Sequence, residues 1–570
     1  MAANVDTLPR HRLIVLAGVM VGFGLILTWQ LVRWQVIERD QFISIVENRP
    51  TGGEQTPARR GRILDRQGHP LALDTIEYQI TATPGWIGDP GQVALRLAPL
   101  LELPAQELTA MLSSDTPWVL LRRRVSREVG ETLREWDIYG LHVTHWPRRG
   151  YPEGSLAAHL LGFVAQDQQG FYGIEGYYNQ LLAPSAFPTE AEEKSATPTS
   201  SVATEIFPFS LAKVTKQGSP DLILTVDRVI QHIAEQELDA AINQHRASGG
   251  SVIVMDPRSG AILAMASRPV YDPEYYSQTP STELWADPAV TWDYEPGSVF
   301  KIVTVASALD AGTITLDQTF DDKGVIEVGG RQLYNWDRQA HGHVTITDAM
   351  TLSLNTVMAE VNTTVGPKIF YAYVQRFGFG RPTGIDLTGE SEGQLKLPSD
   401  AMWNESELGT NAFGQGLAVT PLQMACGVAA IANRGTMMVP HVLQEIVSQD
   451  QVWPRHPTVA RQVVSPETAK QVTEILIRAA QEGAPASVVP GYTIAGKSGT
   501  AQIPIPGGYD PEWTIASFVG FAPAHEPQFL ILVKVDRPQD TPWGAAVAAP
   551  VFRNIAQRLF VMMDIQPPRE

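Results

Sequence analysis

The chain is organised around Glu295-Pro296-Gly297-Ser298-Val299-Phe300-Lys301, with the run 302–309 (IVTVASAL) behind it. A proline and a glycine break the chain, and the residues after them can all propagate a helix, which places Ser298 at or near a helix start. The run is apolar on nearly every face, so we expect a helix buried in a large domain. Ser298 and Lys301 are three residues apart and therefore leave the same face of one turn.

A serine and a lysine in this relation can perform acyl transfer. A serine hydroxyl is a weak nucleophile until a base takes its proton, and a lysine can be that base only if burial and nearby positive charge lower its pKa. A helix N-terminus inside a core supplies both conditions, and its backbone N–H groups favour a developing oxyanion. We therefore predict Ser298 as the nucleophile and Lys301 as its base.

The Ser-x-x-Lys pattern alone is weak, because Ser210-Leu211-Ala212-Lys213 matches it as well. Two further motifs favour Ser298. Ser353-Leu354-Asn355 is the only Ser-x-Asn in the sequence, and Lys497-Ser498-Gly499 is the only Lys-Ser/Thr-Gly. Both lie downstream of Ser298, in the order known for penicillin-binding proteins and class A β-lactamases.

Together the three motifs resemble those of penicillin-binding protein transpeptidases. The flanking segments 294–298, 411–416 and 495–502 are similar to the class B, monofunctional branch, and the similarity runs from about Arg59 to about Phe552. The resemblance implies an α/β catalytic domain of the penicillin-recognising serine transferase fold (β-lactamase/transpeptidase-like). It also implies an N-terminal α+β pedestal domain and one transmembrane helix.

The resemblance also implies a role for each motif residue. Ser353 would relay a proton, and Asn355 would contact Lys301 and the substrate amide. Lys497, Ser498 and Thr500 would hold a terminal carboxylate from an edge strand. Gly499, which lacks a side chain, would let the substrate backbone pair closely with that strand, and the backbone N–H groups of Ser298 and Thr500 would form the oxyanion hole.

Composition excludes several other classes of protein. The net charge of -18 argues against a nucleic-acid partner, and 570 residues suggest two or three domains. The single cysteine, Cys426, excludes an intramolecular disulfide and lacks the partners of a metal site. We predict no metal and no organic cofactor.

Residues 13–31 (LIVLAGVMVGFGLILTWQL) carry no charge and are long enough to span a bilayer core as a helix. Arg10 and Arg12 precede the segment, so the positive-inside bias places residues 1–12 in the cytoplasm, 13–32 in the membrane and the rest outside. The alternative is a cleaved signal peptide, which would have a shorter apolar region and a small-residue cleavage site. We predict a single-pass anchor in a bacterial cytoplasmic (inner) membrane.

Residues 33–220 are predicted to form the non-catalytic pedestal, a dimerisation-like domain. Segments 59–68, 149–152 and 173–176 resemble it, and no motif of a glycosyltransferase occurs there. Within it, residues 183–204 (APSAFPTEAEEKSATPTSSVAT) lack periodicity and apolar surface, which predicts a disordered surface loop of unknown function.

The transpeptidase domain is predicted to occupy 221–570. It starts with a strand at 221–227 and an amphipathic helix at 230–242, and a hairpin follows at 251–265. Two strands near the C-terminus, 514–521 and 529–535, complete a sheet assembled from both ends of the domain.

The activity implied by the resemblance is D,D-transpeptidation of peptidoglycan stem peptides through a Ser298 acyl-enzyme formed on D-Ala-D-Ala ends. β-Lactams would trap Ser298. The implied partner is a glycosyltransferase of the SEDS type (shape, elongation, division and sporulation), with other membrane proteins of wall synthesis.

Three alternatives remain open. Asn335-Trp336, His341-Gly342 and the tail 543–552 look closer to the septal branch than to side-wall enzymes. A class A β-lactamase would need a deacylating glutamate, and no Glu-x-x-Leu-Asn element lies between Asn355 and Lys497. A non-enzymatic β-lactam sensor would want several membrane spans or a cytoplasmic effector.

Overall fold

The computed structural model describes residues 59–183, 219–448 and 451–567, together with residues 20–22, 24 and 29. The chain divides into two compact units, Met1–Pro57 and Ala58–Glu570. The described residues of the first unit are helical. Within the described part of the chain no helix is long and apolar enough to cross a membrane. The predicted span 13–32 and the predicted loop 183–204 lie almost wholly outside the described residues.

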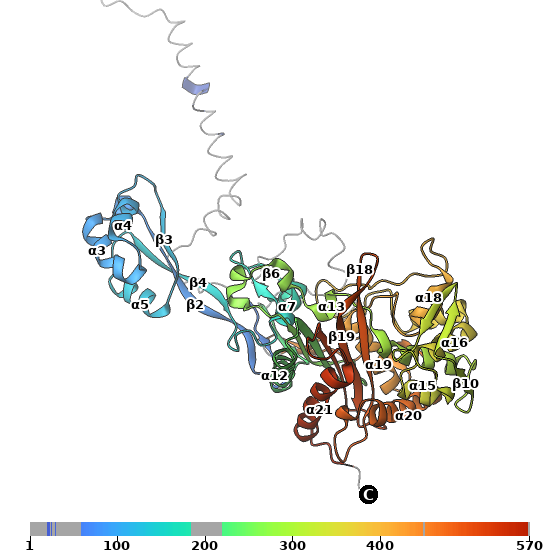
Figure 1. The fold of residues 1–570 in the computed structure, drawn as a ribbon. Coiled ribbons are helices and arrows are strands. Elements are labelled where there is room, and N and C mark those ends of the chain that lie inside the picture. The colour runs from blue at the N-terminus through green and yellow to red at the C-terminus, as the bar shows by residue number, and fades with distance from the viewer. Residues whose placement is uncertain are drawn as a thin grey trace, which may run out of the picture. The chain divides into compact units, whose positions relative to one another are not determined.

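A five-stranded antiparallel sheet lies at the centre of the second unit (Figure 1). Its spatial order is β18 (Ala495–Ile505), β19 (Gly508–Ala522), β20 (Phe529–Asp536), β8 (Gly249–Met255) and β9 (Ile262–Arg268). The predicted hairpin 251–265 is confirmed as β8 and β9, and the two predicted C-terminal strands as β19 and β20. Because β20 pairs with β8, the sheet is assembled from both ends of the domain, as predicted.

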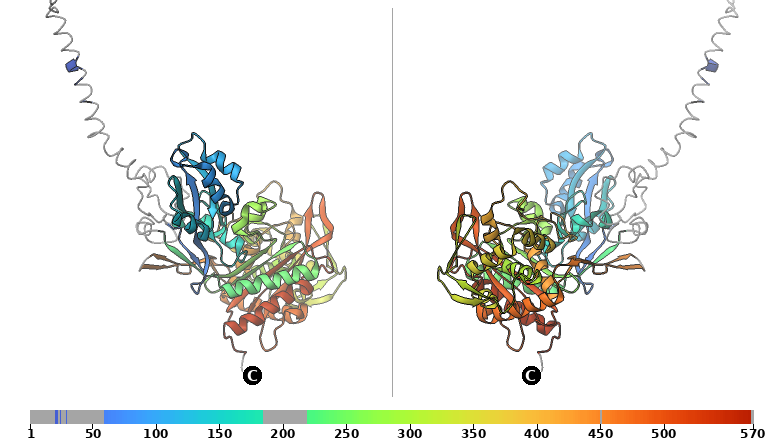
Figure 2. Two further views of the ribbon diagram at one scale, coloured as in Figure 1. Left: turned by 90° about the vertical axis from the view of Figure 1, so that its left-hand side faces the viewer. Right: turned by 90° about the vertical axis from the view of Figure 1, so that its right-hand side faces the viewer.

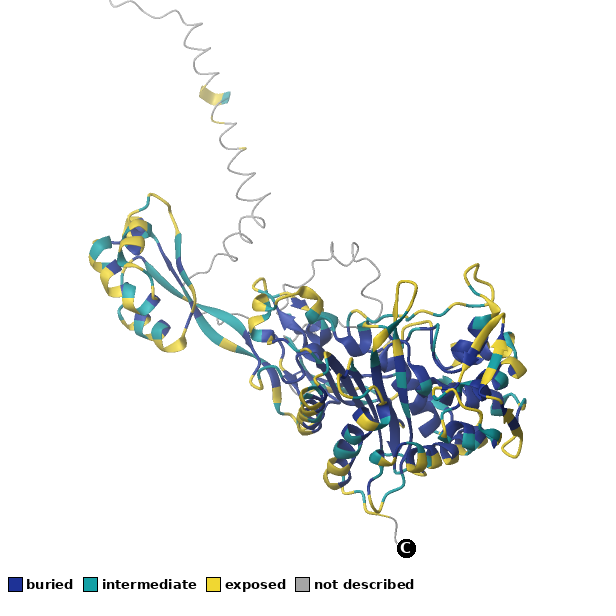
Figure 3. Ribbon diagram, in the orientation of Figure 1, coloured by how far each residue is buried: buried dark blue, intermediate teal, exposed yellow. Residues whose placement is uncertain are grey.

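Helices cover both faces of this sheet. On one face α12 (Arg228–His245), which contains the predicted helix 230–242, packs with α21 (Gly544–Met562) (Figure 2). On the other face α14 (Lys301–Asp310) and α19 (Pro421–Ala432) pack into a larger apolar core. Strands β8, β9 and β20 are almost completely buried between the two helical layers, whereas residues 502–514 at the end of the β18–β19 hairpin are exposed or half-buried (Figure 3). Further helices on the α14 side are α13 (Pro288–Thr291), α15 (Ile346–Thr351), α16 (Asn355–Val365), α17 (Pro367–Arg376), α18 (Glu405–Asn411) and α20 (Pro466–Gly483).

A second sheet carries the N-terminal part of the unit. Its order is β16 (Gln451–Pro454), β15 (Leu443–Ser448), β7 (Asp221–Leu224), β1 (Ile63–Leu64), β2 (Pro70–Ala82) and β3 (Val119–Val125), with β4 (Leu141–Gly150) also paired to β2. Beside β2, β3 and β4 pack α3 (Pro90–Leu101), α4 (Ala105–Leu112) and α5 (Arg127–Glu135). The segment 221–224, expected to begin the catalytic domain, lies in this second sheet because its backbone pairs in parallel with β1.

A buried ion-pair network joins the three segments that resemble the pedestal. Arg60 Nε donates to Glu175 Oε2 at 2.7 Å, and Arg149 Nε donates to Glu175 Oε1 at 2.6 Å. Asp74 accepts from the Arg60 backbone N–H at 2.7 Å and from Arg149 Nη1 at 3.1 Å. The sequence showed only a resemblance of these segments to the pedestal domain, whereas in the fold their charged side chains join segments that are distant in the chain.

Candidate active site

Ser298 lies at the start of a helix, as predicted. It belongs to the 3₁₀ turn η6 (Gly297–Phe300), which continues directly into α14, whose first eight residues are all buried. Gly297 has a φ of 59°, and its N–H donates to the carbonyl of Gly414 at 3.0 Å. Because Ser298 is in the first turn, its own N–H has no acceptor within the helix. Its half-buried hydroxyl has no hydrogen-bond partner within the described residues.

Lys301 is fully buried and its Nζ has three oxygen neighbours. They are the Ser353 carbonyl at 2.7 Å, Asn355 Oδ1 at 2.8 Å and Ser353 Oγ at 3.1 Å. Burial, and secondarily the charge of Lys497, lowers the pKa of Lys301 well below its ordinary value. The two carbonyl oxygens use the two hydrogens of a neutral amine, and its lone pair is left for a hydroxyl proton. Three oxygen neighbours suit an ammonium group as well as an amine, and it is the lowered pKa that favours the neutral lysine, which can accept a proton.

The Ser353-Leu354-Asn355 loop connects α15 to α16. Ser353 has a left-handed φ of 57°, and Asn355 is the first residue of α16. The side chains of Ser353 and Asn355 leave the same side of this loop, since both contact Lys301. Asn355 Nδ2 also donates to the Tyr334 carbonyl at 3.1 Å. These contacts join a loop and a helix start that lie more than fifty residues from Lys301 in the sequence.

A buried asparagine, Asn335, supports this loop from behind. Its Oδ1 accepts from the backbone N–H groups of Asn355 at 2.9 Å and Thr356 at 3.2 Å, and from Thr356 Oγ1 at 2.9 Å. Its Nδ2 donates to Asp322 Oδ2 at 2.8 Å and to the Gln339 carbonyl at 3.0 Å. In the sequence Asn335 was noted only as part of a septal-type segment, and no pattern connected it to Ser353 or Asn355.

Lys497, Ser498, Gly499 and Thr500 lie on β18, which is an edge strand as predicted. Lys497 is buried, and this burial lowers its pKa to about 8. Its Nζ donates to the Ser498 carbonyl at 3.0 Å. Lys497 is the positive charge that helps to lower the pKa of Lys301.

Gly499 and Thr500 make contacts that the sequence did not predict. A Cβ on Gly499 would lie 2.6 Å from Ser517 Oγ and 3.0 Å from Val299 Cγ1, so the missing side chain lets the η6 turn approach β18. The expectation that the missing side chain also admits the substrate backbone stays a prediction. Thr500 Oγ1 accepts from the Gly544 N–H at 3.1 Å, which commits one lone pair of this hydroxyl to the start of α21.

Two exposed tryptophans connect the Ser353 loop to the β18 side of the site. Trp336 Nε1 donates to the Leu352 carbonyl at 3.1 Å, and Trp543 immediately precedes Gly544. Their rings meet edge to face with 5.3 Å between centroids. Sequence reasoning named neither ring as part of the site.

Other candidate sites give little. Within the described residues no cluster of three or more His, Cys, Asp or Glu side chains could hold a metal ion. In the septal-type segment His341-Gly342, His341 Nε2 lies 3.0 Å from Asp337 Oδ2. The second Ser-x-x-Lys match, 210–213, lies outside the described residues. Cys426 is buried, which raises its pKa and disfavours the thiolate.

A sheet with helices on both faces, and a serine one turn before a buried lysine, define the class of serine acyltransferases. Residues 250–557 match the family described as penicillin binding protein transpeptidase domain, and residues 55–196 match the penicillin-binding protein dimerisation domain. The chain therefore belongs to the penicillin-binding protein transpeptidase family, and it is an enzyme.

Relatives with known names cover nearly the whole chain. It is 33% identical to Stage V sporulation protein D of Bacillus subtilis, over 99% of this chain and 87% of that protein. It is 29% identical to peptidoglycan D,D-transpeptidase FtsI of Escherichia coli, over 94% of this chain and 89% of that protein. Penicillin binding protein 3 from Mycobacterium tuberculosis, solved in complex with aztreonam, superposes with a TM-score of 0.68 at 27% identity, covering 90% of this chain and 98% of that one.

Proposed function

We propose that this enzyme is a peptidoglycan D,D-transpeptidase in which Ser298 is the nucleophile. The observation that carries the proposal is the buried, deprotonation-prone Lys301, three residues after Ser298 and hydrogen-bonded to both Ser353 and Asn355. A protein that only bound the peptide would gain no affinity from a lysine whose positive charge is disfavoured by burial. Acyl transfer uses it as the base that takes the serine proton.

The reaction proceeds in two steps. Ser298 Oγ attacks the carbonyl carbon of the penultimate D-alanine while its proton passes to Lys301 Nζ. The backbone N–H groups of Ser298 and Thr500 stabilise the oxyanion. The C–N bond then breaks, and the leaving D-alanine amine takes a proton through Ser353 Oγ, which lies 3.1 Å from Lys301 Nζ. An amine from a second stem peptide then attacks the acyl carbon, and its proton passes through Ser353 Oγ to Lys301. The bond to Ser298 Oγ breaks, Ser298 takes the proton back from Lys301, and the cross-link is formed.

The β18 residues hold the terminal carboxylate of the donor peptide. Lys497 supplies positive charge, and the hydroxyls of Ser498 and Thr500 supply hydrogen bonds, although the Thr500 hydroxyl already accepts one from Gly544. A β-lactam presents a carboxylate and a strained amide in the same relation, so it acylates Ser298 and blocks it. Asn355 holds Lys301 on one side through Oδ1, and its Nδ2 group faces the backbone of Tyr334.

The cellular setting is proposed from the sequence. Residues 13–32 anchor the enzyme in the cytoplasmic membrane, with 1–12 inside and the pedestal (33–220) and transpeptidase domain (221–570) outside. The segment 335–342 and the tail 543–552 favour septal wall synthesis over side-wall synthesis. Because a monofunctional transpeptidase cannot polymerise glycan, a glycosyltransferase of the SEDS type supplies the strands.

Fluorescent penicillin tests the catalytic assignment. Ser298→Ala should abolish covalent labelling and cross-linking without loss of thermal stability, because one partly exposed hydroxyl is removed. Ser210→Ala, the matched variant at the second Ser-x-x-Lys, should label normally. Labelling that persists in the first variant and disappears in the second would reverse the assignment. In cells, labelling concentrated at the side wall and absent from septa would refute the septal role.

A further inference from the structure

The loop formed by residues 411–416, which follows α18, contacts two of the elements that carry the reacting groups. Its Ala412 carbonyl accepts from Thr304 Oγ1, on α14, at 2.8 Å. Its Gln415 Nε2 donates to Gln502 Oε1, on β18, at 3.3 Å. The sequence connected this 411–416 loop only to the class B branch and assigned it no role. In the structure it lies against both the buried helix and the edge strand of the site.

The residues just before Ser298 pair with this loop and with the segment that follows it. Tyr294 and Val419 exchange both of their backbone hydrogen bonds, each at 2.9 Å. Gly297 N–H donates to the Gly414 carbonyl at 3.0 Å. A Cβ on Gly414 would lie 2.3 Å from the Gly297 carbonyl oxygen, so the two backbones are in direct contact. The position of the Ser298 turn therefore depends on the position of the loop.

Glu295 adds a side-chain contact between these two segments. It is 7% exposed, and its Oε1 accepts from the Gly416 N–H at 3.0 Å and, at a longer 3.4 Å, from the Tyr509 hydroxyl of the β18–β19 hairpin. Burial raises the pKa of Glu295, and the bond from Gly416 acts in the opposite direction. One carboxylate thus joins the Ser298 turn to the loop and to the hairpin.

The turn and the hairpin carry the two backbone N–H groups that the proposed function assigns to the oxyanion. One is the N–H of Ser298 on η6, and the other is that of Thr500 on β18. A Cβ on Gly297 would lie 3.1 Å from the Thr500 carbonyl oxygen, so η6 packs directly against β18. Hydrogen bonds weaken steeply as their distance and angle depart from the optimum. The stabilisation of the oxyanion therefore depends on how η6 is held relative to β18.

We propose that Glu295 is a positioning residue for Ser298. By accepting from Gly416 it holds the 411–416 loop against η6 and β18, and in this way it fixes the two oxyanion donors relative to each other. This inference rests on the proposed function, which supplies the oxyanion. Donors aimed at an oxyanion act on the transition state more than on the bound ligand. Loss of Glu295 should therefore slow acylation without weakening the initial complex with a penicillin.

The test measures acylation of the full chain in detergent by a fluorescent penicillin. A series of penicillin concentrations separates the dissociation constant of the initial complex from the rate constant of acylation. Glu295→Ala removes the acceptor, so it should lower the rate constant at least about tenfold and leave the dissociation constant within about twofold of the parent value. Glu295→Gln keeps an oxygen that can accept from the Gly416 N–H, so it should recover most of the rate.

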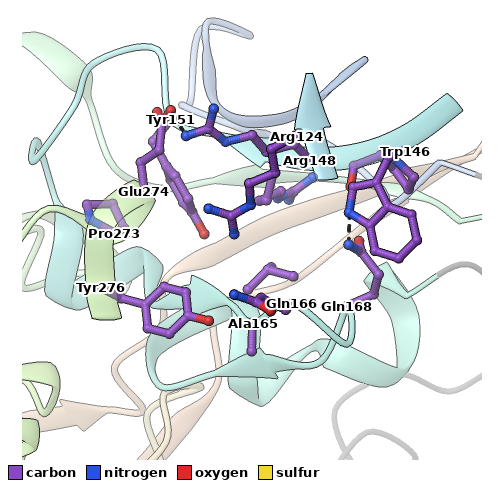
Figure 4. A pocket seen from close by; sticks show the side chains of 13 residues that line it. Arg124, Trp146, Arg148, Tyr151, Ala165, Gln166, Gln168, Pro273, Glu274 and Tyr276 are labelled. Atoms are coloured by element: carbon purple, nitrogen blue, oxygen red, sulfur yellow. Dashed lines mark hydrogen bonds and ion pairs between the residues drawn. The ribbon is translucent and has the colours of Figure 1, made fainter. Parts of the chain in front are cut away.

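Two carboxylates away from the site are the controls. Glu235 on α12 is also 7% exposed and accepts from a backbone N–H group at 2.8 Å. Glu274, on η4 (Pro273–Gln278), forms an ion pair with Arg148 on β4 (Figure 4). Glu235→Ala should lower the melting temperature about as far as Glu295→Ala does. Both control variants should nevertheless be acylated at the parent rate, because these contacts involve neither η6 nor β18.

Four results would overturn the proposal. They are a parent-like rate constant in Glu295→Ala, a change confined to its dissociation constant, a Glu295→Gln variant as slow as Glu295→Ala, and an equally slow Glu235→Ala. If Glu295→Ala does not fold, Glu295→Asp replaces it, since its carboxylate is one methylene shorter and loses Gly416; a parent-like rate constant there overturns the proposal as well. In all these cases the parent protein is labelled and the proposed function stands. A parent that is not labelled at all refutes the transpeptidase assignment, and the positioning role of Glu295 fails with it.

Discussion

Asn335→Asp should destabilise the enzyme in a pH-dependent way and slow acylation of Ser298. The exchange keeps Oδ1, which accepts from the N–H groups of Asn355 and Thr356. It replaces the donor Nδ2 by a second oxygen, 2.8 Å from Asp322 Oδ2 in the parent geometry. At neutral pH two carboxylates would face each other in a site where Asn335 is 2% exposed.

The magnitude follows from the contacts that change. Two donated hydrogen bonds are lost, to Asp322 and to the Gln339 carbonyl, and a like-charge contact replaces the first. A buried unsatisfied group costs about 1–3 kcal/mol, so we expect a loss of roughly 2–5 kcal/mol in the free energy of unfolding. Crowded carboxyls raise the pKa of one of them, so the proton bound at lower pH restores a donor. The loss should therefore be present above that raised pKa and shrink as the pH falls through it.

Urea unfolding at pH 7.5 and pH 5 measures this effect relative to the parent. Asn404→Asp is the control, since that exposed asparagine caps α18 as an acceptor and aspartate caps equally well. At pH 7.5 the rate of fluorescent-penicillin labelling should fall roughly tenfold or more, because Asn355 shifts with its support. A variant as stable as the parent at pH 7.5, or one whose loss is the same at both pH values, would refute this account of Asn335.

Three further predictions address the site directly. Lys301→Arg should reduce acylation nearly as far as Lys301→Ala, because a guanidinium stays protonated; near-normal labelling would mean that Lys301 acts only through its charge. The acylation rate should rise with pH as Lys301 loses its proton and fall above about pH 8, where Lys497 loses its own. Lys497→Arg should remove only the descending limb, and an unchanged descending limb would assign it to another group. Gly499→Ala should displace the Ser298 turn and slow labelling at least tenfold, since its Cβ would lie 3.0 Å from Val299 Cγ1 and 3.3 Å from the Pro296 carbonyl oxygen, whereas Gly508→Ala, with nothing within 4 Å, should be neutral; equal rates would show that the turn adapts.

Local patterns in the sequence were sufficient for the elements and for the nucleophile. Ser298 and Lys301 are one turn apart, so the helical period alone brings them to one face. Alternating and continuous apolar runs predicted β8, β9, β19 and β20. Burial on a sheet produces a pattern of apolar residues that can be recognised from a few consecutive positions. The motif order then separated Ser298 from the second match at Ser210.

Only the tertiary structure decided what surrounds these residues. Lys301 owes its lowered pKa to burial and to Lys497, which is nearly two hundred positions away in the sequence. Asn335 is hydrogen-bonded to the backbone of Asn355, twenty residues further along the chain, and no helical or strand period predicts a contact at that separation. The missing side chain of Gly499 lets the η6 turn approach β18. Desolvation, charge proximity and close approach depend on distances in space between segments remote in the chain. A linear pattern records which side chains are available, while the folded packing sets their partners, their pKa values and the space between them.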